Sequence, residues 1–86
     1  MRIRIDPHTL ERAAERGADA AEIEDVIQTG SAVAARGRRF GKAKVYPFGR
    51  ERHGRYYDQK RVEVYYVAEG EDIVTVTVYV FYGQWK

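Results

Sequence analysis

Three side chains near the N-terminus have the types and spacing that proton transfer and phosphate binding require. His8, Arg12 and Arg16 follow one another at intervals of four residues, which places them on one stripe of an α-helix. An imidazole can exchange a proton near neutral pH, and two guanidiniums can clamp a phosphate. The N–H groups of a first helical turn, where His8 would lie, also favour an anion. The alternative is a solvated face on which Glu11 and Glu15 pair with the arginines.

A second group of candidates lies in the basic segment, residues 36–61. It holds ten Lys and Arg against Glu51 and Asp58, a balance of +8, so the rest of this +2 chain carries −6. Its cations are interleaved with aromatic residues, as in surfaces that hold phosphates and stack unpaired bases. The alternatives are a loop that its charges keep soluble, or the docking of an acidic partner. The expected RNA-binding residues are Arg38, Arg39, Lys42, Lys44, Arg50, Arg52, Arg55 and Lys60.

Residues 2–17 predict a short strand and a helix. Residues 2–5 alternate charged and apolar side chains, as a strand with one buried face does. Asp6 and Pro7 are typical of a helix start, and Gly17 is typical of a helix end. The expected core side of this helix, opposite His8, consists of Leu10, Ala13 and Ala14.

A second helix is predicted to follow at once. Asp19 and Glu22 have the spacing of a capping box, and Gly30 ends the pattern. The two helices would form a hairpin. The apolar stripe of the second helix is Ala20, Ile23, Val26 and Ile27, and its expected outer face is acidic, with Glu22, Glu24 and Asp25.

The rest of the chain predicts strands. Residues 32–35 and 43–48 are weak candidates, residues 50–59 read as a polar loop, and residues 61–68 and 72–82 are strong strands joined by a hairpin signal. Both faces of the last strand are apolar, so we expect it to be central. The fold class is α+β: a short strand, a two-helix hairpin and a twisted antiparallel sheet, β-α-α-β-β-β. On the last strand, one face is expected to carry Val74, Val76, Val78, Val80 and Tyr82.

Composition excludes several classes of protein. The chain of 86 residues has the size of one domain, residues 1–86. Without cysteine it has neither disulfides nor thiolate metal sites, and no spacing supports a histidine metal site or a cofactor. Charges in the first 20 residues exclude a signal peptide, and the longest apolar stretch, residues 73–82, is too short to cross a bilayer. We expect a soluble, cytoplasmic protein that does not bind membranes.

Three parts of the sequence carry a resemblance to a known family. These are His8-x3-Arg12-x3-Arg16-Gly17, the acid-capped second helix, and the closing run from Val76 to Trp85. Together they resemble an uncharacterised family of prokaryotic domains that is similar to the BrnT and RelE/ParE toxins of toxin–antitoxin systems. The likeness covers residues 3–85. It implies two helices packed on a twisted antiparallel sheet.

The resemblance also implies an activity, which is metal-independent cleavage of RNA, often of mRNA on the ribosome. Basic groups on the sheet and a tyrosine near the C-terminus would orient the scissile phosphate; here that tyrosine is Tyr79 or Tyr82. The last strand has no Arg where several RNA-cleaving relatives carry one, and ParE-like members act on gyrase. The basic groups would be Lys42, Lys44, Lys60 and Arg61.

In the leading hypothesis, the ribose 2′-OH attacks the adjacent phosphate in a transesterification. His8 would be the general base or acid, while Arg12, Arg16 and Arg61 would stabilise the developing charge and Tyr82 would assist. A non-catalytic module that docks an acidic antitoxin-like protein or a nucleic acid is the alternative. A third hypothesis is a homodimer that pairs through the aromatic C-terminal strand.

Overall fold

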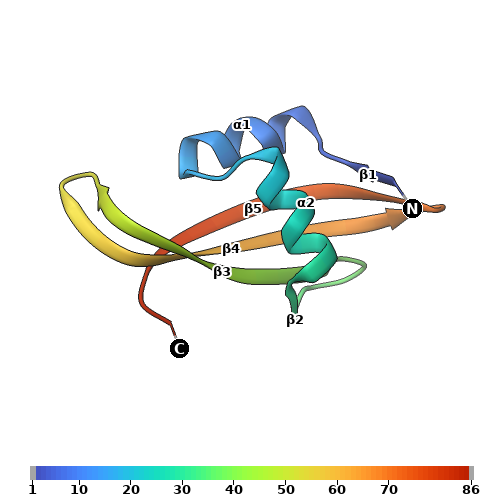
Figure 1. The fold of residues 1–86 in the computed structure, drawn as a ribbon. Coiled ribbons are helices and arrows are strands. Elements are labelled where there is room, and N and C mark those ends of the chain that lie inside the picture. Colours follow the sequence, from blue (N-terminus) through green and yellow to red (C-terminus); the bar gives the residue numbers. More distant parts are fainter. Residues whose placement is uncertain (1, 86) are drawn as a thin grey trace.

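The described part of the chain folds into two helices and a five-stranded sheet (Figure 1). The structure is a computed structural model that describes residues 2–85. Both helices lie on one face of the sheet; we call the opposite face the outer face (Figure 1). The predicted α+β class, with a strand, a helical hairpin and a sheet, is confirmed. The elements are β1 (Arg2–Arg4), α1 (Pro7–Arg16), α2 (Ala20–Thr29), β2 (Ser31–Val33), β3 (Phe40–Arg52), β4 (Arg55–Glu69) and β5 (Asp72–Gly83).

Both helices begin and end where the sequence predicts. The Asp6 side chain caps α1 by accepting a hydrogen bond of 2.9 Å from the His8 backbone N–H. Gly17 ends α1 with a φ of 97°, a conformation that glycine adopts without a steric penalty. At the start of α2, Asp19 and Glu22 form the predicted capping box. Neither helix of residues 2–85 has the length and apolar character needed to cross a membrane.

The sheet is mixed, with strand order β1-β5-β4-β3-β2. β1 pairs in parallel with the start of β5, whereas the other pairings are antiparallel, as predicted. The prediction that the last strand is central holds only at its start, where β5 lies between β1 and β4, because β1 pairs only with Asp72, Ile73 and Val74 of β5. The central strand is β4, which has a long partner on each side. Most of β5 is therefore an edge of the sheet.

β3 and β4 form a longer hairpin than the sequence predicts. Residues 50–59, expected as a polar loop, continue both strands and turn at His53 and Gly54, whose φ values are 54° and 79°. Two successive positive φ values are typical of a two-residue hairpin turn. We call residues 48–59 the arm, since it projects beyond the helices (Figure 1). Most arm residues are exposed, so no buried face imposes the apolar alternation by which a strand is predicted.

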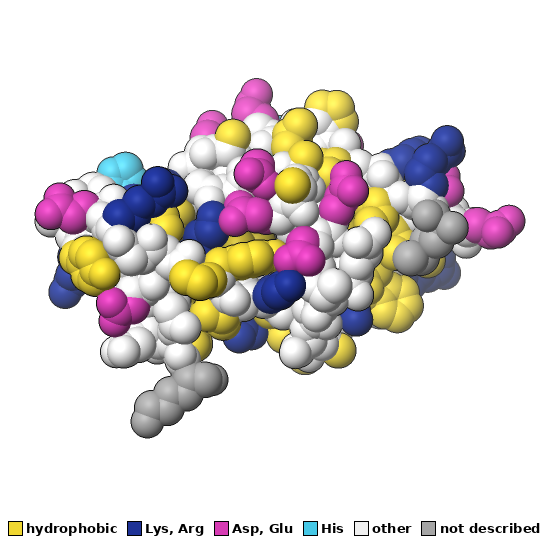
Figure 2. Space-filling view, in the orientation of Figure 1, with side chains coloured by type: hydrophobic (Ala, Val, Ile, Leu, Met, Phe, Trp, Pro, Cys, Tyr) yellow, Lys and Arg dark blue, Asp and Glu magenta, His cyan; other side chains and the backbone are white. Residues whose placement is uncertain are grey.

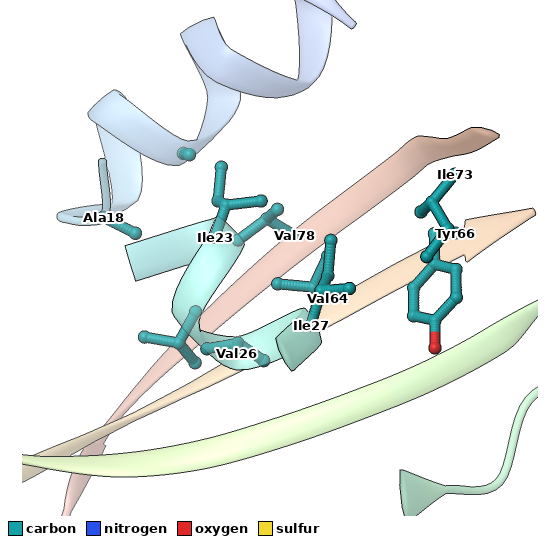
Figure 3. Close-up of a cluster of buried hydrophobic side chains, with 10 residues drawn as sticks. Ala18, Ile23, Val26, Ile27, Val64, Tyr66, Ile73 and Val78 are labelled. Atoms are coloured by element: carbon teal, nitrogen blue, oxygen red, sulfur yellow. The ribbon is translucent and has the colours of Figure 1, made fainter. Parts of the chain in front are cut away.

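The hydrophobic core lies between α2 and the middle of the sheet (Figure 3). Ile23 and Val26 of α2 are fully buried, as are Val64 of β4 and Val78 of β5. Each such side chain stabilises the fold by about 1.5–3 kcal/mol. From α1 only Ala13 joins this cluster among the buried residues described. The position of α1 therefore depends strongly on polar contacts with the sheet.

Candidate functional site

Side chains of α1 bind the open edge of β5. The Thr9 hydroxyl donates to the Val76 carbonyl oxygen at 3.3 Å, and the Arg16 guanidinium donates to that of Val78 at 2.7 Å. An uncovered edge would leave these carbonyls as a template for pairing with another chain. The His8 stripe, as we call His8, Arg12 and Arg16, thus lies along a strand.

The buried side of α1 differs from the predicted one. Thr9 and Ala13 are buried, whereas Leu10 is 40% exposed and Ala14 is exposed as well. The helix is turned so that its polar contacts with β5, and not its largest apolar residue, face the sheet. This rotation brings the His8 stripe to the sheet edge. The sequence had instead predicted that the stripe points away from the core side of the helix.

A bulge in β5 decides which side chains reach the outer face. Tyr65 of β4 pairs with Thr77, but the next residue, Tyr66, pairs with Thr75, so Val76 is an extra residue. The alternation of faces shifts by one residue there. The predicted single face of valines is therefore wrong. Beyond the bulge, Val78, Val80 and Tyr82 lie on the helix side, and Thr77, Tyr79 and Phe81 lie on the outer face.

Two adjoining depressions bring the His8 stripe together with part of the basic segment. The helix-side depression, of about 320 Å³, lies between the stripe and Thr77 and Tyr79. The loop-side depression, of about 290 Å³, is lined by the same two residues and by Arg36 and Arg39 of the β2–β3 loop. We call the two together the outer groove. Its lining is His8, Thr9, Arg12, Arg16, Ala34, Ala35, Arg36, Arg39, Tyr65, Val76, Thr77 and Tyr79.

The outer groove combines cations with exposed aromatic rings. No Asp or Glu of residues 2–85 lines it. Tyr79, in the groove, is 43% exposed, and its neighbour Phe81, which is outside the lining, is 46% exposed. The Tyr79 ring centroid lies 6.0 Å from that of Tyr65 and 6.3 Å from that of Phe81, and the Arg16 guanidinium carbon lies 5.5 Å from it. A guanidinium at this distance has cation–π attraction to the ring.

A carboxylate on the outer face holds its neighbours in place. Glu63 accepts hydrogen bonds from the Tyr65 hydroxyl at 2.9 Å and from Arg61 Nε at 3.0 Å. Burial, and then the hydrogen bond to Glu63, raise the pKa of Tyr65, so its phenol stays protonated at neutral pH. Arg61, predicted to stabilise charge on RNA, is paired with Glu63. Its charge is therefore partly neutralised, and it does not line the groove.

The structure places two predicted RNA contacts, Lys44 and Lys60, on the helix-covered face of the sheet and not in the outer groove. Lys60 is 7% exposed; its ammonium donates to the Gly17 carbonyl oxygen and pairs with Glu22, both at 2.8 Å. Lys44 pairs with Asp25, also at 2.8 Å. The Lys60 and Glu22 side chains are only 9% and 23% exposed, so removing Lys60 would leave a poorly solvated carboxylate behind. The expected acidic outer face of α2 is corrected accordingly, because Glu22 and Asp25 reach back to the sheet.

Asp25 makes folding stability depend on acid pH. Hydrogen bonds from Lys44, and then from the Tyr46 hydroxyl at 2.5 Å, lower the pKa of Asp25 from 3.8 to about 2. Burial, and then Asp25, raise the pKa of Tyr46. A depressed carboxyl pKa stabilises the fold above the unfolded pKa and loses that effect as pH falls through the folded one. From pH 4 to pH 2, we expect the free energy of unfolding, measured with urea, to fall more in wild type than in Asp25→Asn. Parallel losses in the two proteins would contradict this.

Tyr82 lies at the C-terminal end of α1 and not in the outer groove. Its hydroxyl donates to the Arg16 carbonyl oxygen at 2.7 Å. Arg52, which was predicted to bind RNA, donates to the Glu15 carbonyl oxygen at 3.0 Å, and its guanidinium carbon lies 4.9 Å from the Tyr82 ring centroid. Both side chains thus satisfy carbonyls that a helix end leaves without partners. Of the two phenols expected to orient a phosphate, only that of Tyr79 lines the groove.

The remaining predicted cations are dispersed. Arg38 is exposed in the β2–β3 loop, and Lys42 is half-buried on the helix side of β3. Arg50 and Arg55 are exposed on the arm, where the Arg50 guanidinium carbon lies 4.7 Å from the Phe48 ring centroid. On the helix-covered face, Asp and Glu gather over the helices (Figure 2). Only Arg39 of the predicted RNA-binding set lines the outer groove.

Sequence reasoning missed part of the groove. Arg36 and Tyr65 were not among the candidate residues, although both line the loop-side depression. The alternation of residues 61–68 could have placed Tyr65 opposite the core. The contribution of Arg36 follows only from the course of the loop. No group of three or more His, Cys, Asp or Glu that could hold a metal ion occurs in residues 2–85.

Comparison with known proteins identifies one family. A family model described as "Domain of unknown function (DUF4258)" matches residues 5–80. This span includes every lining residue of the outer groove. No curated protein and no solved structure matches the chain. These comparisons give no link to the BrnT and RelE/ParE toxins, so that resemblance stays a prediction.

Proposed function

We propose that this chain, which belongs to the DUF4258 family of unknown function, binds single-stranded RNA through its outer groove. One observation carries the proposal: the two depressions meet at Thr77 and Tyr79. A single RNA strand lying across Tyr79 would have the His8 stripe on one side and Arg36 and Arg39 on the other. Cations would hold its phosphates, while exposed rings would stack on its bases.

Single strands suit this surface better than duplexes. The bases of a duplex are stacked on both faces, whereas those of a single strand can lie on aromatic side chains. Tyr79 and Phe81 are exposed neighbours on the outer face, with ring planes 27° apart. They could therefore support two adjacent bases.

The salt dependence of RNA binding tests the phosphate contacts. If each of the four groove arginines contacts one phosphate, with about 0.7 in slope per contact, a plot of log Kd against log salt concentration should have a slope of about 3 in magnitude. A Kd that does not change with salt would contradict the phosphate contacts.

The finer proposal is a toxin-like endoribonuclease activity. The ribose 2′-oxygen would bond to the adjacent phosphorus and the bond from phosphorus to the 5′-oxygen would break, leaving a 2′,3′-cyclic phosphate. His8 would accept the 2′-OH proton, and the leaving oxygen would take a proton from the imidazolium or from water. Arg12 and Arg16 would stabilise the charge on the phosphate. The groove supports Tyr79, rather than Tyr82, as the phenol near that phosphate.

Two single substitutions, one at each histidine, test this activity. His8→Asn should lower RNA cleavage by about 10²–10⁴-fold, while binding stays near that of wild type. His53→Asn is the matched control, because His53 lies at the hairpin turn of the arm, and it should cleave like wild type. The measurements are total-RNA integrity after induced expression in a bacterium and cleavage in vitro, each with and without ribosomes. Intact RNA with wild type would contradict cleavage; equal cleavage by both variants would contradict the role of His8.

A further inference from the structure

We propose that the loop-side depression is a pocket for one unpaired RNA base. This inference rests on the RNA binding proposed above and adds the class of substrate: a strand with an unstacked base. The depression, of about 290 Å³, is at the small end of the range of ligand pockets. It has an aromatic side, an apolar wall and two cations, which are the features that a base next to its phosphates requires.

The aromatic side of this pocket is formed before any ligand binds. The Tyr65 and Tyr79 rings meet edge to face at 74°, and the Tyr65 hydroxyl is held by Glu63. Gly41, which pairs with Tyr65 across β3 and β4, leaves room for that ring, because a Cβ there would lie 2.8 Å from a Tyr65 ring carbon. A fixed ring lowers the entropy cost of stacking.

The opposite wall is the β2–β3 loop. Ala34 and Ala35 present methyl groups, and Arg36 and Arg39 line the same depression. The Arg39 N–H donates to the Arg36 carbonyl oxygen at 3.1 Å. This turn, which passes through Gly37 at a φ of 63°, sets the two arginines at one pocket. Both arginines are exposed and line the depression, so both are accessible to a ligand.

The pocket continues into the helix-side depression at Tyr79. A base between the loop and the rings would thus have its flanking phosphate near Arg12 and Arg16. A base inside a duplex cannot enter, because its faces are covered by its neighbours. An acidic peptide would be attracted by the same cations, but its carboxylates would not stack on the tyrosine rings.

Filling the pocket tests the inference. The probe is a single-stranded RNA hexamer, compared with an abasic hexamer of the same backbone and with an acidic peptide. Wild type should bind the RNA about tenfold or more tightly than the abasic strand, as stacking predicts. Ala35→Trp should lose about tenfold in RNA affinity while keeping its affinity for the abasic strand. Ala32→Trp is the matched control, since Ala32 is exposed on β2 outside the lining, and it should bind like wild type.

A measurement on the unaltered protein covers the case in which Ala35→Trp fails to fold. The NMR signals of the Ala34 and Ala35 methyl groups should shift with RNA, through the ring current of a bound base, but not with the abasic strand. RNA binding that Ala35→Trp leaves unchanged, or methyl signals that do not shift, would overturn the base pocket alone. A wild type that binds no RNA would overturn the proposed function as well. Tighter binding of the acidic peptide would overturn both in favour of a protein partner.

Discussion

Replacing Gly17 by alanine is expected to destabilise the protein by about 3 kcal/mol, a large effect for one methyl group. The φ of Gly17 is 97°, a region where a non-glycine residue costs about 1–2 kcal/mol. In addition, a Cβ at this position would overlap the Tyr82 hydroxyl oxygen. That hydroxyl cannot move away freely, because it donates to the Arg16 carbonyl oxygen. Urea unfolding gives the change in the free energy of unfolding.

Gly70→Ala separates backbone strain from overlap. Gly70 also has a positive φ, 63°, but a Cβ there would meet nothing within 4 Å. We expect it to cost about 1 kcal/mol, from backbone strain alone. If Gly17→Ala costs no more than Gly70→Ala, Tyr82 does not pack against the end of α1 as described.

Tyr82→Phe tests the hydrogen bond alone, because it keeps the ring. It should lower the free energy of unfolding by about 1 kcal/mol for the lost hydrogen bond, without a direct effect on RNA cleavage.

The Tyr79→Ala substitution is expected to weaken binding of single-stranded RNA by about 10–100-fold. Stacking of one base on an aromatic side chain is worth about 1–3 kcal/mol, and Tyr79 lines both halves of the outer groove. The loss should appear in Kd at constant salt, with an almost unchanged salt slope, because no cation is removed. Tyr79 is 43% exposed, so the loss of its ring contacts with Tyr65 and Phe81 should lower the free energy of unfolding by about 1 kcal/mol or less.

The control for Tyr79→Ala is Tyr56→Ala. The Tyr56 side chain is the more exposed of the two, at 60%, and lies on the arm, outside the groove. It should leave RNA affinity within about twofold of wild type. A larger loss with Tyr56→Ala than with Tyr79→Ala would move the binding surface from the groove to the arm. In that case the exposed cations of the arm, and not the His8 stripe, would hold the phosphates.

The helices were predictable because their signals are local. Asp6, Gly17 and the Asp19–Glu22 capping box act within one turn of chain, so the sequence alone contains the cause of each boundary. The β4–β5 pair was predictable for a similar reason, since apolar alternation and a turn signal lie next to each other. The mixed character of the sheet was not, because the pairing of β1 with β5 joins residues 70 positions apart.

The candidate site was harder to predict because its determinants act between elements. One extra residue, Val76, exchanges the faces of β5, and nothing in the alternation of valine and threonine marks it. Lys44 and Lys60 looked like RNA contacts because their partners, Asp25 and Glu22, lie on a helix far away in the sequence. A charge count cannot tell a paired lysine from an available one. The His8 stripe was identified from its spacing, but its place beside Tyr79 depends on the rotation of α1.

The most direct test of the outer groove compares two double variants of equal charge. Arg12→Ala/Arg36→Ala removes one cation from each half of the groove, and Arg50→Ala/Arg55→Ala removes two from the arm. The measurement is the Kd for a single-stranded RNA as a function of salt. We expect the groove variant to bind at least about tenfold more weakly and to lose about 1.4 from the magnitude of the salt slope, while the arm variant keeps the wild-type slope. Equal losses in the two variants, or a loss confined to the arm variant, would contradict RNA binding in the outer groove.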